Sequence, residues 1–304
     1  MKKKVWIIGT GLVVGSALMV SSAFANMGDA RGYEAYKTAL KTTAAVDNAT
    51  QHIVLSVRDN GSELLNVDAT VKESQSGSAV SSKTSIRTGA ETAAIDFYKQ
   101  QEGMIIKNSR SDIYNVVKGE NEQDDQEREW NGDPAFDQSV EKIIDALVGN
   151  VKNNFTLSEA SGGRTTVEMK LAGSQIPTAA NVIGSIIVKE ALSGKHSQAE
   201  HGSKQPEAAE LLGLDLKQLD PHLPQLSDQV NIDQITLHAN IDEHHYVTDQ
   251  TLELTVSGKD ASGHAHKLVV SADIGISGID TTVPDKVDLA GKKVKVIEEA
   301  DLKE

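Results

Sequence analysis

Two histidines near the end of the chain, His264 and His266, are the side chains whose spacing most suggests chemistry. They lie two residues apart in a segment, 264–276, whose apolar and polar residues alternate. In a strand, this alternation directs both imidazoles to the side that carries the apolar residues. We expect them on the covered face, near its open end, where a neutral imidazole pair could bind a metal ion or hydrogen-bond a polar headgroup.

A zinc site would require further ligands for this histidine pair. His244 and His245 are the closest candidates in sequence, and no carboxylate is fixed nearby by spacing. Histidine is also common at strand ends and in polar turns. We therefore predict no metal and no cofactor, and a hydrogen-bonding role for the pair.

Signatures of covalent catalysis and phosphate binding are missing from the sequence. It has no G-x-S-x-G, P-loop, H-E-x-x-H or dinucleotide fingerprint, and cysteine is absent. One S-x-x-K occurs at Ser139–Lys142, but the S-D-N and K-T-G motifs that accompany it in penicillin-binding proteins do not. We predict that the protein has no catalytic residue and is not an enzyme.

The N-terminus has the layout of a secretory signal. Lys2–Lys4 precede an uncharged, mostly apolar run, Val5–Ala25, which ends in small residues. Cleavage after Ala25 is expected; the alternative is an uncleaved anchor, because the run is close to the roughly 20 residues that span a membrane. Either reading places the body outside the cytoplasm, secreted or attached to the outer face of the membrane.

The charge of the chain argues against nucleic acid as a partner. The net charge is −14, and loss of the three signal lysines leaves 27 basic against 44 acidic residues, a net charge of −17. Such a surface repels phosphate backbones and anionic headgroups. A bound lipid would therefore have to be held mainly by its acyl chains.

Hydrophobic periodicity predicts a short helix over 33–44 and then an antiparallel meander, beginning with a hairpin at Asp59–Asn60–Gly61. Apolar stripes predict two more helices, over 133–148 and 177–193. The further expected strands are 52–58, 63–72, 79–87, 93–99, 103–107, 112–118, 155–159, 165–171, 232–241, 246–258 and 264–276.

These elements predict an α+β fold, in which a large curved antiparallel sheet, a half-barrel of about ten strands, has two or three helices covering its concave face. We expect residues 26–304 to form a single domain. Residues 194–229 break the pattern with a stretch containing His, Gln and Pro, which we interpret as an insertion or lid.

The order of elements resembles the superfamily of bacterial lipoprotein carriers and related envelope lipoproteins that bind lipids or glycolipids. The matching features are the helix at 33–44, the Asn60–Gly61 hairpin, the inserted aliphatic helices and the closing hairpin at 246–276. The chain departs from that family in lacking a lipobox cysteine and in carrying the insertion. The resemblance implies an apolar cavity between sheet and helices, and it carries over no catalytic residue.

The sequence thus predicts a non-catalytic extracytoplasmic protein that binds a lipid or another amphipathic molecule in the bacterial envelope. The alternative is a sensory or structural envelope module with a filled core, which contacts another protein. The aliphatic stripes fit both readings, since core helices and cavity walls share the same periodicity. The candidate ligand-binding residues are Val182, Ile183, Ile186, Ile187, Leu254, Val256, His264, His266, Leu268 and Val270.

Overall fold

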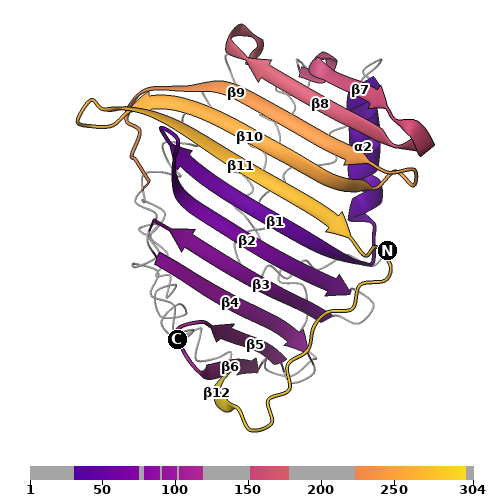
Figure 1. Ribbon diagram of the computed structural model, residues 1–304, viewed down its shortest axis with the longest axis vertical. Coiled ribbons are helices and arrows are strands. Elements are labelled where there is room, and N and C mark those ends of the chain that lie inside the picture. Colours follow the sequence, from indigo (N-terminus) through magenta and orange to yellow (C-terminus); the bar gives the residue numbers. More distant parts are fainter. Residues whose placement is uncertain are drawn as a thin grey trace.

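The computed structural model describes residues 31–74, 79–89, 91–100, 103–118, 151–177 and 223–298. These residues form one sheet of twelve strands with a single α-helix (Figure 1). The helix is α2 (Arg31–Ala44), and short 3-10 turns cover Lys152–Asn154, Ser161–Gly163 and Gly173–Gln175. The strands are β1 (Asn48–Asp59), β2 (Ser62–Ser74), β3 (Ala79–Thr88), β4 (Glu91–Gln100), β5 (Gly103–Asn108), β6 (Ile113–Lys118), β7 (Phe155–Glu159), β8 (Thr165–Ala172), β9 (Asp228–Ile241), β10 (Val247–Lys259), β11 (Ala265–Ser277) and β12 (Lys293–Glu298).

The strand order shows two meanders joined at the middle of the sheet. It runs β12-β6-β5-β4-β3-β2-β1-β11-β10-β9-β8-β7, so β1 and β11 pair although more than 200 residues separate them. Every pair is antiparallel except β12 with β6, which is parallel. That parallel pairing is possible because residues 278–292, which we call the strap, carry the chain along the sheet from the end of β11 to the far edge (Figure 1).

The expected α+β class is wrong for this protein. The described chain is nearly all sheet, mixed rather than purely antiparallel, and α2 is its single helix. The expected helices over 133–148 and 177–193 lie outside the described residues, as does most of the predicted insertion at 194–229. Of that insertion the structure describes residues 223–229: 223–227 form no helix or strand, and Asp228 and Gln229 begin β9.

Helix α2 packs across β7–β10, near the β7 edge of the sheet. We call the face of the sheet that α2 covers the inner face. The buried tyrosines of the helix contact the ring of Phe155 in β7, Tyr33 edge-on at 5.5 Å between centroids and Tyr36 stacked at 6.2 Å. The hydroxyl of Tyr36 donates to Oε1 of Gln250 in β10 at 2.7 Å, and Oγ1 of Thr43 accepts from the backbone N–H of Val247. The helix is therefore fixed to the sheet by both ring contacts and polar contacts. No helix among the described residues combines the length and the apolar character that crossing a membrane requires.

The strap crosses the outer face over β2–β5, on the side opposite α2. Gln100 of β4 makes two hydrogen bonds with the backbone of Val287, each 3.0 Å long, and Nζ of Lys72 lies 2.7 Å from the carboxylate of Asp285. Val287 and Leu289 pack on Tyr98 and its buried neighbours in β5 and β6. The strap thereby attaches the C-terminal edge strand β12 to the N-terminal meander.

Candidate functional site

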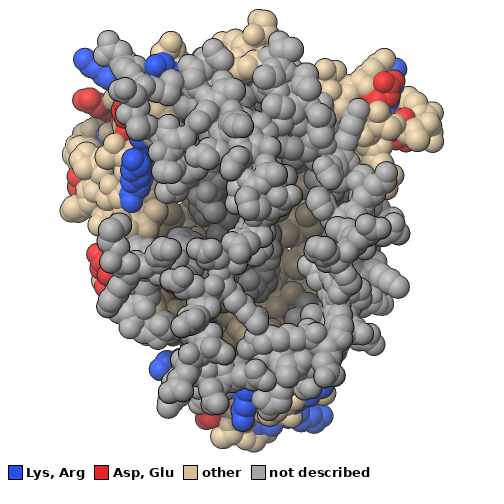
Figure 2. All heavy atoms as spheres, turned by 180° about the vertical axis from the view of Figure 1, so that it is seen from behind, with Lys and Arg blue, Asp and Glu red and all other residues tan. Residues whose placement is uncertain are grey.

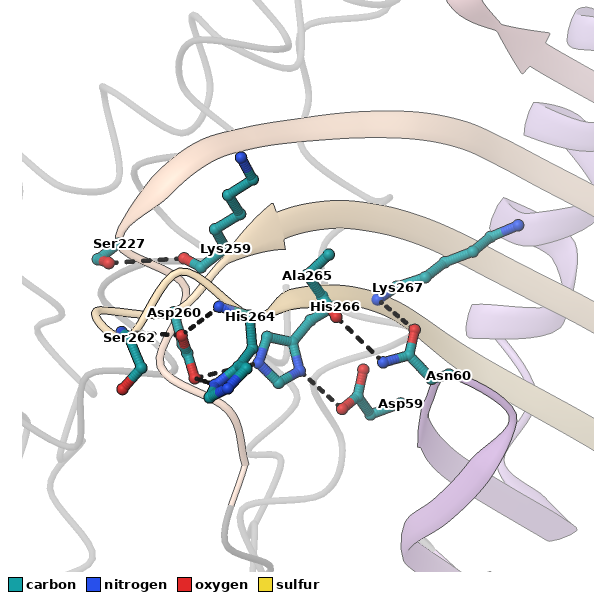
Figure 3. A network of polar contacts seen from close by, with 10 residues as sticks. All are labelled: Asp59, Asn60, Ser227, Lys259, Asp260, Ser262, His264, Ala265, His266 and Lys267. Atoms are coloured by element: carbon teal, nitrogen blue, oxygen red, sulfur yellow. Dashed lines mark hydrogen bonds and ion pairs between the residues drawn. The ribbon is translucent and has the colours of Figure 1, made fainter.

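Two hairpin turns meet at one end of the sheet because β1 pairs with β11. Asn60, with φ of 49°, and Gly61, with φ of 87°, form the turn between β1 and β2, as the Asn-Gly signal predicts. Nδ2 of Asn60 donates to the carbonyl of Ala265 and its Oδ1 accepts from the backbone N–H of Lys267, both at 3.2 Å (Figure 3). The first hairpin is thus attached to β11 by a side chain that cannot ionise.

The second turn, Asp260–His264, is organised by one carboxylate. Oδ1 of Asp260 accepts the backbone N–H of Ser262 at 2.9 Å and that of His264 at 2.8 Å. Gly263 adopts φ of 84°, which a residue with a side chain rarely adopts. Burial acts to raise the pKa of Asp260, but hydrogen bonds from His264 and Ser262, together with the nearby ring of His266, outweigh it and lower this pKa to about 2. The group is therefore an anion at all physiological pH values.

His266 lies between carboxylates from the two turns. Its Nδ1 is 2.8 Å from Oδ2 of Asp59, at the end of β1, and its Nε2 is 3.5 Å from Oδ2 of Asp260 (Figure 3). The side chains of His266 and Asp59 are each only 16% exposed. The hydrogen bond to Asp59 is the largest cause of a raised pKa for His266; partial burial opposes the increase, and the charge of Asp59 and the contact with Asp260 add to it.

The two histidines predicted to act as a pair are in different environments. His266 lies on the inner face with Leu268, as the alternation predicts. His264 precedes β11, belongs to the turn, and has a side chain 76% exposed with Nδ1 3.1 Å from Oδ2 of Asp260. Sequence reasoning missed Asp59 and Asp260; the Asp-Asn-Gly signal placed Asp59 at a hairpin turn, and only the pairing of β1 with β11 brings it beside His266.

His244 and His245 do not lie near this cluster. They belong to the turn at the other end of β10. Strand β10 has 13 residues and, at roughly 3.3 Å per residue, spans about 40 Å, which separates this turn from the cluster. Across the part of the chain that the structure describes, no group of three or more His, Cys, Asp or Glu side chains is arranged to hold a metal ion. The four residues Asp59, Asp260, His264 and His266 instead hydrogen-bond and pair with one another.

The predicted apolar residues of β10 and β11 lie on the inner face, next to this cluster. Leu254 is opposite Val270, and Val256 is opposite Leu268. Val256 and Leu268 are fully buried, whereas Leu254 and Val270 are partly exposed. The other predicted ligand-binding residues, Val182, Ile183, Ile186 and Ile187, lie outside the described residues.

Through the strand pairing, these residues continue into two neighbouring rows of side chains that run across six strands. We call these two rows the apolar band. Most of its side chains are only partly buried, although they are aliphatic. Figure 2 shows the molecule from behind, and the charged side chains that are visible in it lie around the edge of the view. The rows are Ile235, Leu254, Val270, Val57 and Leu65, and Leu237, Leu252, Ala272, Leu55, Val67 and Ile86.

The opposite, outer face of the same strands carries a shallow polar groove of about 590 Å³. Its lining includes Arg58, Glu253, Thr255 and Lys267, each adjacent in sequence to an inner-face residue. The alternation of the strands therefore separates a polar face from an apolar one, as the sequence predicts.

Comparisons with known proteins give only distant similarities. No family model matches the chain, and no curated protein matches it in sequence. Among solved structures, LprF from Mycobacterium bovis has 15% identity and a TM-score of 0.34, over 86% of this chain and 98% of its own. A DUF1329 family protein from Desulfovibrio piger has 8% identity and a TM-score of 0.21, over 85% of this chain and 95% of its own.

Proposed function

We propose that this chain is a non-catalytic, extracytoplasmic protein that binds a lipid or another amphipathic molecule along the inner face of its sheet, in the bacterial cell envelope. The observation that carries the proposal is the apolar band. Its partly exposed aliphatic side chains come from six adjacent strands, β3, β2, β1, β11, β10 and β9.

A filled core would bury these side chains completely. Each fully buried Leu or Ile gains about 1.5–3 kcal/mol relative to an exposed one, so a band of partly exposed aliphatics leaves favourable burial unrealised. An acyl chain laid along the band would realise it without any polar group to satisfy. Such extended apolar surface is typical of a ligand-binding or protein-binding face.

The two ends of an amphipathic ligand would meet different surroundings. Next to the aliphatic rows of the band, one row holds Val256, Leu268 and Asp59, and His266 lies in the row beyond it. The proposed pose places the acyl chain on the aliphatic rows and the polar headgroup near the His266 cluster. The signal layout of the N-terminus supports an envelope location.

A fluorescent fatty acid, cis-parinaric acid, tests this proposal by titration. We expect saturable binding to the parent chain and about 5–150-fold weaker binding to Leu254→Asn, because a buried amide without a partner costs about 1–3 kcal/mol. The matched control is Glu253→Gln, which changes the adjacent residue on the outer face and should bind like the parent. Equal binding by parent and Leu254→Asn, or none by the parent, would contradict the proposal and favour the interaction module.

A further inference from the structure

The two turns at the His266 end of the sheet are attached to each other in two chemically different ways. Asn60 joins the β1–β2 turn to β11 through amide hydrogen bonds, which do not titrate. His266 joins Asp59 to Asp260 through an imidazole, which does. The second attachment alone reaches into the β10–β11 turn, because Asp260 organises that turn.

The protonation state of His266 decides how many carboxylates it can hold. Protonated imidazole has two N–H donors, so Nδ1–H donates to Asp59 while Nε2–H points toward Oδ2 of Asp260, 3.5 Å away. Neutral imidazole has one donor, and the shorter contact with Asp59 retains it on Nδ1. The Nε2 lone pair then faces an anionic oxygen, which replaces an attraction by a repulsion.

We propose that Asp59, His266 and Asp260 form a pH-sensitive latch, which holds the β10–β11 turn against the β1–β2 turn while His266 is protonated and releases it when the proton is lost. Two buried atoms support this assignment. Nε2 of His266 and Oδ1 of Asp59 have no hydrogen-bond partner among the described residues. Leaving a buried nitrogen without a hydrogen-bond partner is costly. A proton on Nε2 therefore favours a closer approach of this nitrogen to Asp260, and loss of the proton removes that preference.

The remaining charged groups around the ring do not replace this pairing. Lys259 and Lys267 flank His266 on β10 and β11, and in Figure 3 their ammonium groups extend away from the ring. Arg58 precedes Asp59 and lines the groove on the outer face. From β9, Asp228 pairs in register with Lys259 and accepts the backbone N–H of Gln229, and His264 is held by Asp260.

The direction of the pH effect follows from the raised pKa of His266. A folded-state pKa above the unfolded value means that the latch contributes stability fully below the unfolded value, about 6.5, and loses that contribution as pH rises through the folded value. Asp260 remains ionised throughout, since its pKa of about 2 lies far below this window. The turn borders the inner face, so its release would open the headgroup end; this consequence rests on the proposed function, whereas the latch does not.

The chain contains a matched reference turn for the test. Asp242 organises the β9–β10 turn in the same way, accepting the backbone N–H of His244 at 3.0 Å and that of Tyr246 at 2.8 Å. His245 occupies the positive-φ position that Gly263 has in the other turn. Among the described contacts, no histidine attaches this reference turn to a carboxylate on another hairpin. His244 lies 3.8 Å from Asp242, much as His264 lies beside Asp260, so the amides of the reference turn report the pH effects that both turns share.

The experiment measures amide hydrogen exchange by NMR between pH 5 and 8, together with the titration of the His266 ring. We expect the exchange of the His264 amide relative to the Tyr246 amide to rise severalfold as His266 deprotonates. In Asp59→Asn, the His266 pKa should fall and the change in the exchange ratio should shift to lower pH with it. The control Asp68→Asn removes the carboxylate of an exposed pair with His52, 3.0 Å apart, and should leave both measurements unchanged.

Two results would overturn the latch. One is an exchange ratio that does not change with pH in the parent chain. The other is a His266 titration that is the same in the parent and in Asp59→Asn. The parent measurements alone decide the first point, so the test holds even where a variant folds poorly.

Discussion

Replacing Tyr36 by Phe should destabilise the protein although it removes a single oxygen atom. The hydroxyl donates to Oε1 of Gln250 at 2.7 Å, and the two residues are 3% and 9% exposed. Without the hydroxyl, a buried amide oxygen loses its partner, which costs about 1–3 kcal/mol. At roughly 2–4 °C per kcal/mol for domains of about this size, the melting temperature should fall by about 2–12 °C.

A double-mutant cycle separates the lost bond from other effects of the substitution. Tyr36→Phe combined with Gln250→Leu replaces both partners by apolar groups, so the pair should recover much of the stability lost in the single variants. Tyr246→Phe is the control, since the Tyr246 hydroxyl makes no hydrogen bond to another described residue, and it should melt like the parent. If Tyr36→Phe melts within about 1 °C of the parent, the hydrogen bond does not fix α2 to the sheet as described.

Three further predictions test other parts of the chain. Gly32→Val should destabilise by about 1–3 kcal/mol in chemical denaturation, because even a Cβ at Gly32 would lie 3.0 Å from the carbonyl oxygen of Phe155; parent-like stability would refute this close approach. Gln100→Ala should cost more than Asp285→Ala, because it removes two part-buried bonds to the strap, whereas the ion pair of Asp285 with Lys72, whose side chains are 32% and 38% exposed, contributes about 0–1 kcal/mol; the reverse order of melting temperatures would contradict the description. The mature protein should begin at Asn26, and mass analysis that finds intact Met1 in the exported protein would exclude cleavage.

Much of the sheet could be predicted from the sequence because its strands alternate strictly between apolar and polar residues. Helix α2 and strands β1–β11 lie where the periodicity places them. Strand β12 was not predicted, although Lys and Val alternate over residues 293–296; its parallel pairing with β6 depends on the path of the strap, which tertiary contacts determine. The sheet has twelve strands where about ten were expected, and the pairing of β1 with β11 spans a sequence separation that local patterns do not encode.

The candidate site was only partly predictable, because it too depends on strand pairing between distant parts of the chain. Alternation placed His266 correctly on the inner face, but the partners of His266 come from two turns whose meeting depends on the β1–β11 register. The turn signal at Asn60–Gly61 indicated a hairpin, but it did not indicate that β11 and the β10–β11 turn lie beside this hairpin. His264 was expected on the covered face, yet the carboxylate of Asp260 draws it into an exposed turn.

Native mass spectrometry of the exported protein after mild purification tests the central claim most directly. The account predicts additional mass from a co-purified lipid, which is lost on organic extraction and restored by incubation with a long-chain fatty acid. The Leu254→Asn variant should carry less of it than the Glu253→Gln control. A clean mass of the polypeptide alone, with no fatty acid bound on incubation, would contradict the proposal that the apolar band binds an amphipathic molecule.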